Sequence, residues 1–246
     1  MNLEIYQLIL IAVITLLASY IQSVAGFGFG IFAMIFLPRL LVYTEANVLS
    51  TMLSAFTSLA VVVAMRKHIH WKNIIFPFVG CLTTTLLAVN FIKMQKNETL
   101  SLLLGIALFL LSIYFLVFSK KIKIKPTWYS GLIAGALSGI MGGMFSMSGP
   151  PVVVYYVQSE EDTNCYLATL SAYFICSDAV SITTKATAGF INLNVWVAFL
   201  IGFVAMVIGA IIGKRSRDKI KPDTLKKAVY ILMAISGAMN IVMAII

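Results

Sequence analysis

Charged residues are scarce in this chain. Asp, Glu, Lys and Arg make up only 11% of its 246 residues, whereas hydrophobic residues make up 61%. A soluble domain of this size needs far more polar surface. Several apolar runs instead reach the roughly 20 residues that a helix needs to cross a bilayer. The scarcity of charge therefore excludes a soluble globular protein and predicts an all-α, polytopic membrane protein.

Cysteine and histidine are also rare. The cysteines Cys81, Cys165 and Cys176 lie in or beside apolar segments and lack metal-binding spacing, so they are interpreted as packing residues. His68 and His70 lie in a basic loop and are interpreted as solvated loop residues, with a proton relay as the alternative. The sequence therefore predicts neither a metal site nor a cofactor.

The motifs of membrane enzymes are missing as well. An intramembrane serine protease needs a serine nucleophile within reach of a histidine base, and both histidines fall outside the apolar segments. Ser148-Gly149 resembles part of a GxSG motif, but residue 146 is serine instead of glycine. Asp178 is the single buried candidate where an aspartyl protease needs two carboxylates, and the chain has no GxxxxGK[ST] loop. We therefore expect no enzymatic activity.

The charges that are present gather in short loops. The net charge is +9, and most Lys and Arg residues fall in Arg66–Lys72, Lys120–Lys125 and Lys214–Lys227, between apolar runs. This is the distribution of cytoplasmic loops under the positive-inside rule and not that of a nucleic-acid-binding surface. We expect a multi-pass protein of the plasma membrane with cytoplasmic basic loops and both termini outside, in contact with lipid and not with nucleic acid.

The chain divides into related halves. We assign residues 1–118 to a first transmembrane repeat, 119–126 ("SKKIKIKP") to a basic cytoplasmic linker and 127–246 to a second repeat. Gly26–Pro38 matches Gly139–Pro151, and "HIHWKNIIFPFVG" at 68–80 matches "FINLNVWVAFLIG" at 190–202. The apolar segments fall at 4–25, 27–43, 46–65, 72–92, 99–118, 128–141, 144–157, 164–186, 193–213 and 226–246. Five segments in each half, in inverted orientation, place all the basic loops on one face, which predicts about 8–10 transmembrane segments in two inverted repeats.

Each half opens with a segment broken by glycine and proline, "SVAGFGFGIFAMIFLP" at 23–38 and "SGIMGGMFSMSGPP" at 138–151. Broken helices persist in a membrane only where they are buried in protein or line a wet cavity. Half-helices starting near Ile31 and Met144 would present free N–H groups, which favour an anion. We expect an anion site built by the backbone of Gly28, Gly30, Gly142 and Gly143 and the hydroxyls of Ser146 and Ser148. The alternative is that the glycines serve only close helix packing.

A polar stripe marks the segment at 164–186. Asp178 and Lys185 are seven residues apart and therefore share a helix face, and Ser50 and Ser54 have similar spacing in the first half. Ionisable residues inside a span are costly and face a partner or a wet cavity. Asp178 is a candidate proton carrier, a partner of Lys185, or one member of a structural pair. Lys185 is a candidate substrate-binding residue, or a side chain that snorkels to the interface.

These features resemble the TauE/SafE family, a group of sulfite exporters and anion permeases. The resemblance rests on "AGFGFGIFAMIFLP" (25–38) and "SGIMGGMFSMSGPP" (138–151), the basic mid-chain linker and the total length. It implies a secondary transporter of sulfur oxyanions such as sulfite or sulfonates. Many members have a glycine triplet where this chain alternates glycine with phenylalanine, so the pocket is expected to be smaller or more apolar.

We therefore interpret the protein as an alternating-access carrier for a small anion. A homodimer is compatible with this interpretation. The alternatives are an anion channel and a membrane protein in which the glycine motifs only pack helices.

Overall fold

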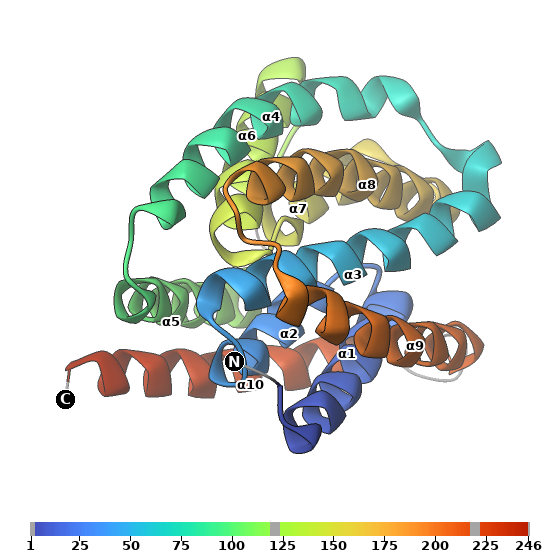
Figure 1. Ribbon diagram of the computed structural model, residues 1–246. Helices are drawn as coiled ribbons and strands as arrows, with labels where there is room; N and C mark the ends of the chain where they lie inside the picture. Colours follow the sequence, from blue (N-terminus) through green and yellow to red (C-terminus); the bar gives the residue numbers. More distant parts are fainter. Residues whose placement is uncertain (1–2, 119–123, 217–221, 246) are drawn as a thin grey trace.

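The computed structural model describes residues 3–118, 124–216 and 222–245, and all regular structure in these residues is helical (Figure 1). Each of the ten predicted segments overlaps one α-helix, but the helix in the predicted segment 27–43 already ends at Phe36 and the one in 144–157 begins only at Gly149. The helices are α1 (Ile5–Ala25), α2 (Phe29–Phe36), α3 (Tyr43–Met65), α4 (Trp71–Lys93), α5 (Asn97–Ile113), α6 (Trp128–Phe145), α7 (Gly149–Ser159), α8 (Thr163–Thr187), α9 (Leu193–Ser216) and α10 (Pro222–Ile245). Three short turns extend them: η1 (Leu37–Arg39), η2 (Arg66–His68) and the π-helical η3 (Tyr114–Phe118).

Six helices of the described part are long and apolar enough to cross a membrane, namely α1, α3, α4, α5, α8 and α9. The other four fall short for different reasons. With 8 and 11 residues, α2 and α7 are half-helices. The 18-residue α6 also lies outside this group, and the described apolar stretch of α10 spans only Lys227–Met243. The prediction of an all-α polytopic membrane protein is confirmed.

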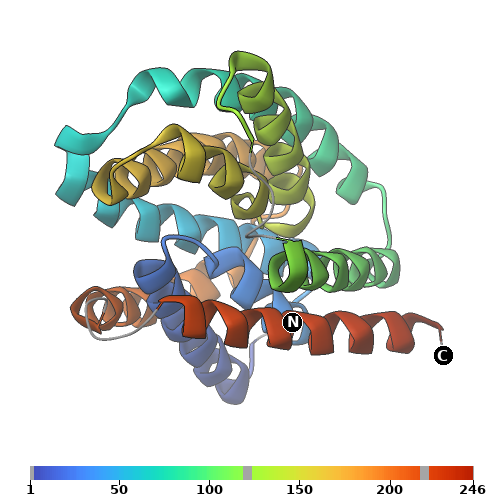
Figure 2. The same cartoon turned by 180° about the vertical axis from the view of Figure 1, so that it is seen from behind.

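Helices from the two halves pack against each other in matched pairs (Figures 1 and 2). The pair α1–α9 has its counterpart in α6–α4, and α3–α9 has its counterpart in α8–α4. The pairs α3–α8 and α5–α10 each join equivalent helices of the two halves. This exchange is what a repeat of five helices predicts. The inverted orientation and the division into two repeats stay predictions, and residues 119–123 of the linker and 217–221 of the last basic loop lie outside the described residues.

The chain reverses direction at each broken segment. The Gln7 side chain at the start of α1 donates to the Leu40 carbonyl beyond α2, over 3.1 Å. In the second half, the Ile124 backbone N–H donates over 2.6 Å to the Gln158 side chain near the end of α7. The helices α1 and α2 therefore form one hairpin, and α6 and α7 form another. We call residues 26–28 the first tip and residues 146–148 the second tip.

The second break lies later than the sequence predicted. The expected half-helix near Met144 is wrong, because α6 continues through Phe145 and α7 begins at Gly149. The glycine pair at 142–143 remains helical, and its role there is to permit close contacts. A Cβ on Gly143 would lie 2.7 Å from the Ala88 Cβ of α4. The turn is made instead by Ser146, which adopts a left-handed φ of 57°.

The first tip depends on glycine. Gly26 has a φ of 83° and Gly28 a φ of 112°, backbone conformations that residues with a Cβ rarely adopt. Its half-helix begins at Phe29, two residues before the predicted start near Ile31. The alternating glycines of the sequence motif are thus needed for the reversal itself.

The centre of the molecule is the antiparallel pair α3–α8. Thr51 near the start of α3 contacts Lys185 near the end of α8, whereas the backbone N–H of His70 beyond α3 contacts Thr169 near the start of α8. The 23 residues of α3 extend over ~35 Å, close to the thickness of a bilayer core. The two ends of this pair are therefore separated by about one membrane thickness.

Candidate functional site between the hairpin tips

The two tips are in direct contact. A Cβ on Gly30, in the first turn of α2, would overlap the carbonyl oxygen of Ser146 in the second tip. In the other direction, a Cβ on Gly149 would lie 3.3 Å from the Phe27 ring of the first tip. Each half-helix thus begins against the turn of the opposite hairpin. Gly30 is required at its position because only a residue without a side chain fits this approach.

A small cavity lies between the tips and the α3–α8 pair. It offers about 20 Å³ to the centre of a water molecule, enough for one or two waters. Five of the predicted site residues line it, namely Gly28, Gly30, Ser146, Ser148 and Asp178, together with Gln22, Phe29, Ile31, Ser54, Met147, Gly149 and Phe174. The sequence singled out Ser54 only as part of a polar stripe, and it gave no weight to Gln22, an isolated amide in an apolar run.

The start of α2 presents unpaired backbone donors to this cavity. Its N-cap is Gly28, which has no side chain to accept from the first turn. Within the described residues, no hydrogen-bond acceptor pairs with the N–H groups of Phe29, Gly30 or Ile31. The N-terminus of a helix also carries partial positive charge. The first tip therefore has the donors and the electrostatic sign of an anion site.

The second tip supplies its donors differently. Pro150 and Pro151 follow Gly149 in the first turn of α7, and proline has no N–H, so α7 offers fewer backbone donors than the sequence analysis expected. Ser148 lines the cavity, and its hydroxyl makes no hydrogen bond within the described residues. A Cβ on Gly142 would overlap this hydroxyl, so Gly142 makes room for Ser148. Ser148 is thus the free hydroxyl donor of the second tip.

Lys185 holds the second tip in place. Its side chain is 0% exposed, so the interpretation of a snorkelling lysine is wrong. The Nζ atom donates to Thr51 Oγ1 over 2.7 Å and to the Gly142 carbonyl over 3.3 Å. This carbonyl lies in the last turn of α6, where the helix dipole favours a cation. Lys185 contacts the tip from behind and is absent from the cavity lining.

Ser146 belongs to the same supporting network. Thr51 Oγ1 donates its one proton to the Asn47 carbonyl over 2.9 Å. Ser146 Oγ, 2.9 Å from Thr51 Oγ1, is therefore the donor in that contact. Asn47 Nδ2 and the Tyr43 hydroxyl both donate to the Met144 carbonyl at 2.7 Å. These α3 side chains satisfy the end of α6, and sequence reasoning did not identify their role.

Asp178 is the carboxyl group of the site. It is 5% exposed and lines the cavity, and its Oδ2 atom has no hydrogen-bond partner within the described residues. It forms no direct ion pair with Lys185 there, since Lys185 turns to Thr51 and Gly142, but the two groups interact electrostatically. The Ser54 side chain also hydrogen-bonds to the Asp178 carboxyl group. Burying an ionisable group with an unsatisfied oxygen atom is costly, which is the usual mark of a functional group in a membrane protein.

Gly143 lies apart from this cavity. Its missing side chain faces Ala88 and Thr85 of α4, and it is absent from the cavity lining. For this residue, helix packing accounts for the glycine without any role in a site.

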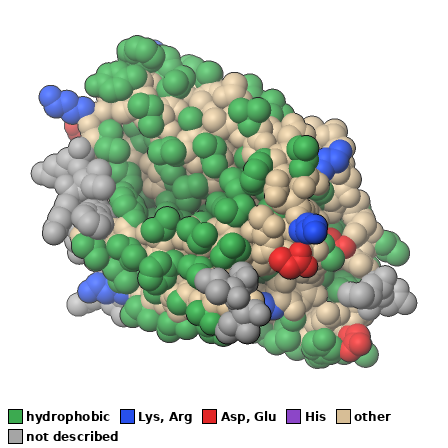
Figure 3. All heavy atoms as spheres, turned by 90° about the vertical axis from the view of Figure 1, so that its left-hand side faces the viewer, with side chains coloured by type: hydrophobic (Ala, Val, Ile, Leu, Met, Phe, Trp, Pro, Cys, Tyr) green, Lys and Arg blue, Asp and Glu red, His purple; other side chains and the backbone are tan. Residues whose placement is uncertain are grey.

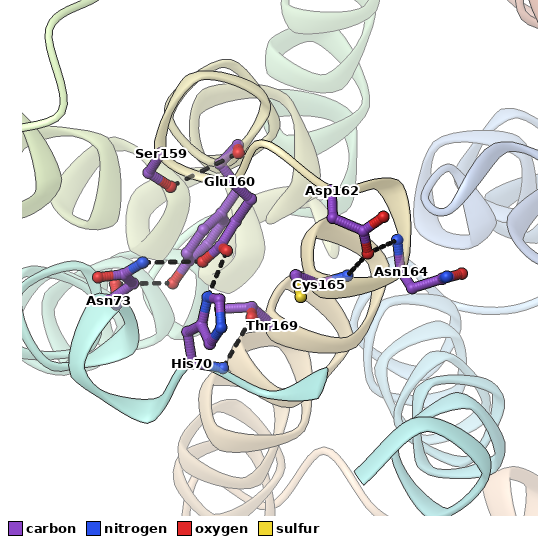
Figure 4. Close-up of polar contacts among 9 residues, drawn as sticks. His70, Asn73, Ser159, Glu160, Asp162, Asn164, Cys165 and Thr169 are labelled. Atoms are coloured by element: carbon purple, nitrogen blue, oxygen red, sulfur yellow. Dashed lines mark hydrogen bonds and ion pairs between the residues drawn. The ribbon is translucent and has the colours of Figure 1, made fainter. Parts of the chain in front are cut away.

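A polar cluster closes one end of the α3–α8 pair (Figure 4). His70 Nδ1 lies 2.6 Å from Glu160 Oε2, and Asn73 Nδ2 donates to Glu160 Oε1 over 2.8 Å. The Glu160 side chain is 1% exposed, whereas that of His70 is 54% exposed. We call His70, Asn73 and Glu160 the Glu160 latch. The interpretation of His70 as only a solvated loop residue is wrong, because it binds a buried carboxylate of the other half.

The start of α8 lies beside this latch (Figure 4). The Asp162 carboxylate accepts hydrogen bonds from the backbone N–H groups of Cys165 and Asn164. These bonds favour the charged form and lower the pKa of the exposed Asp162 carboxyl below its usual value. The N-terminal end of α8 is thereby fixed next to Glu160.

A second inter-half contact closes the opposite end. Asn192 Nδ2 donates to Glu45 Oε1, and Asn192 Oδ1 accepts from the Val195 backbone N–H at the start of α9. Glu45 is 8% exposed. We call Glu45 and Asn192 the Glu45 latch. His70 and Asn192 occupy matching positions just before α4 and α9, so the two latches use equivalent sites at opposite ends of the core.

Comparison with known proteins identifies the family of this chain. A family model described as "Sulfite exporter TauE/SafE" matches residues 11–239. The chain is also similar to a probable sulfite/organosulfonate exporter TauE of Cupriavidus necator, with 24% identity over 230 residues that cover 89% of this chain and 88% of the relative. No solved structure matches. Since the family model spans nearly all of its helices, the chain belongs to the sulfite exporter TauE/SafE family, which is a family of transporters.

Proposed function

We propose that this protein exports small sulfur oxyanions, such as sulfite or organosulfonates, as a secondary transporter of the plasma membrane. The observation that carries the proposal is the group of unpaired N–H donors at the start of α2, in a cavity that Ser148, with its free hydroxyl, also lines. The name of the Cupriavidus relative supports the substrate class. A sulfonate or sulfite group has three acceptor oxygens, which suits donors that converge from two sides.

Helix packing alone does not account for these features. It explains Gly143 and its contact with α4. It gives no reason to leave the N–H groups of α2 unpaired, nor to bury Asp178 beside them, because each unsatisfied polar group costs free energy.

The cavity is too small for a sulfonate, so binding requires the tips to move apart. About 20 Å³ accommodates one or two waters. We infer that transport alternates between states in which one latch opens while the other stays closed. The predicted topology places the Glu160 latch on the cytoplasmic side and the Glu45 latch outside. Release of Glu160 from His70 and Asn73 would then admit the anion from the cytoplasm.

We infer further that Asp178 carries a proton with the anion. An ionised Asp178 would repel an anion in the same cavity, whereas the protonated carboxyl can donate a hydrogen bond to it. Anion binding and proton binding would then favour each other, which couples the two movements.

The function is tested by flux into proteoliposomes that contain the purified protein. The compared anions are sulfite, ethanesulfonate and propionate, each with and without a pH gradient. We expect saturable movement of sulfite and ethanesulfonate, and little movement of propionate, which lacks the third oxygen. Equal movement of all three anions would contradict the substrate class, and flux that never saturates would favour a channel.

The latches are tested by a matched pair of variants, Glu160→Gln and Glu45→Gln. The reporter is Ser54→Cys, a cavity residue, in a chain whose native cysteines are replaced. Each variant keeps the size of its side chain but weakens charge-assisted hydrogen bonds, which are worth about 1.5–3 kcal/mol. We expect Glu160→Gln to raise the labelling of the reporter cysteine roughly tenfold when an impermeant maleimide is added on the face of His70. Glu45→Gln should raise it when the maleimide is added on the opposite face.

Inverted vesicles and spheroplasts present the two faces separately to the reagent. If both variants increase labelling from the same face, the assignment of opposing latches is wrong. If neither variant changes labelling, the contacts do not control access to the cavity.

A further inference from the structure

A second and larger cavity lies outside the hairpin tips. It is an apolar groove of about 430 Å³, a size typical of ligand pockets. The groove runs between α5 with η3, α6 and α7, and is lined by Leu111, Tyr114, Ile124, Tyr129, Ser130, Ile133, Ala134, Leu137, Met141, Pro150, Pro151 and Val154. Figure 3 shows a hollow in this side of the molecule with hydrophobic side chains on its floor.

The groove opens to the surface that faces lipid. Ile133 and Leu137 line it and are both exposed, as is Leu132 beside them. These residues lie on the outer side of α6, whose inner side packs against α4. Within a bilayer such an opening is adjacent to acyl chains. A flexible hydrocarbon chain is therefore the chemistry that fits this apolar groove.

One end of the groove is polar and basic. Lys125 is exposed and directly follows Ile124, which lines the groove. Ser130 Oγ, at the same end, donates to the Lys125 carbonyl over 2.8 Å. Trp128 and Tyr129, residue types that favour the membrane interface, are exposed here as well.

We propose that this groove binds an anionic phospholipid, with one acyl chain along α6 and the phosphate beside Lys125. Basic pockets between transmembrane helices are suited to anionic headgroups. The acyl chain would reach Pro150 and Pro151. The lipid would then pack against the start of α7, which forms one side of the inter-tip cavity. This inference does not depend on which solute is transported.

Quenching of tryptophan fluorescence by lipids with brominated chains tests the proposal. Trp71, Trp128 and Trp196 are replaced by Phe, and a single Trp is placed in the groove by Ile133→Trp. A matched protein carries Leu200→Trp on the exposed surface of α9. Brominated phosphatidylglycerol and phosphatidylcholine are then compared in vesicles of otherwise identical composition.

We expect half-maximal quenching in the groove at a roughly fivefold lower mole fraction of phosphatidylglycerol than of phosphatidylcholine. This factor corresponds to about 1 kcal/mol from one lysine near an anionic headgroup. At Leu200 the two lipids should quench equally. Lys125→Gln should remove the preference, and Ala134→Phe, which fills the groove, should remove the strong quenching of the groove Trp by either lipid.

Equal quenching by the two lipids at both positions would overturn the proposal, as would a preference that survives Lys125→Gln. Native mass spectrometry gives a second readout on the unaltered chain. We expect one phosphatidylglycerol retained per chain and lost in Lys125→Gln. A lipid-free dimer in which Ile133→Cys crosslinks to a second copy would instead assign the groove to self-association.

Discussion

Gly30→Ala is expected to reduce anion flux by roughly a hundredfold or more, the scale on which a displacement of about 1 Å affects a preorganised site. The added Cβ would overlap the Ser146 carbonyl oxygen, which is backbone and cannot turn aside. The two tips must then separate in every state, so the donors of α2 no longer converge with Ser148. Stability should fall by only about 1–3 kcal/mol, typical of overpacking. Flux in proteoliposomes and thermal unfolding in detergent measure the two effects.

Gly202→Ala on α9 is the matched control. There the atoms nearest to the added Cβ belong to side chains and not to backbone, Leu53 Cδ1 at 3.0 Å and Thr15 Cγ2 at 3.3 Å. We expect this variant to transport nearly as well as the parent protein. Normal flux in Gly30→Ala would show that the close approach of the tips is not needed for transport.

Asp178→Asn is expected to abolish accumulation driven by a pH gradient while downhill exchange of the anion continues. The amide keeps the shape of the carboxyl but cannot carry a proton. In the parent protein, binding should weaken as the pH rises, because an ionised Asp178 shares the cavity with the anion. Two unit charges about 4 Å apart repel by about 4 kcal/mol at an effective dielectric constant of about 20. In Asp178→Asn, binding should change little with pH.

Ethanesulfonate is the anion for this measurement, because its own charge does not change over the pH range. Asp162→Asn is the control, since Asp162 lies exposed at the start of α8 and asparagine also caps helices well. An Asp178→Asn protein that still accumulates ethanesulfonate in response to a pH gradient would exclude Asp178 as the proton carrier.

The fold class and the helix positions follow largely from hydropathy. Apolar runs separated by basic loops mark most of the helices within a few residues, because lipid leaves few alternatives to a hydrogen-bonded helix. The break in the second half could not be located in this way. Glycine was taken as the sign of the break, yet the glycines at 142 and 143 stay helical and the reversal occurs at Ser146.

The residue types of the site were predictable, but their separate roles were not. Ser146 and Ser148 look alike in sequence, and only their neighbours show that Ser146 donates to Thr51 while Ser148 is free. Lys185 was singled out as a charge inside a predicted span, with snorkelling left open, but its contact with the Gly142 carbonyl depends on how α6 ends. Glu160 was not identified from the sequence. Its burial against His70 results from packing between residues 90 positions apart.

The central claim is that the anion binds between the hairpin tips, and Ser148→Cys in a chain without native cysteines tests it most directly. The measurement is the rate of alkylation by a small maleimide, with increasing ethanesulfonate or with propionate. The account predicts that ethanesulfonate slows alkylation with saturation, that propionate does not, and that neither affects a cysteine in the exposed loop at Lys67. An alkylation rate at position 148 that is unchanged at ethanesulfonate concentrations that saturate flux would contradict the account.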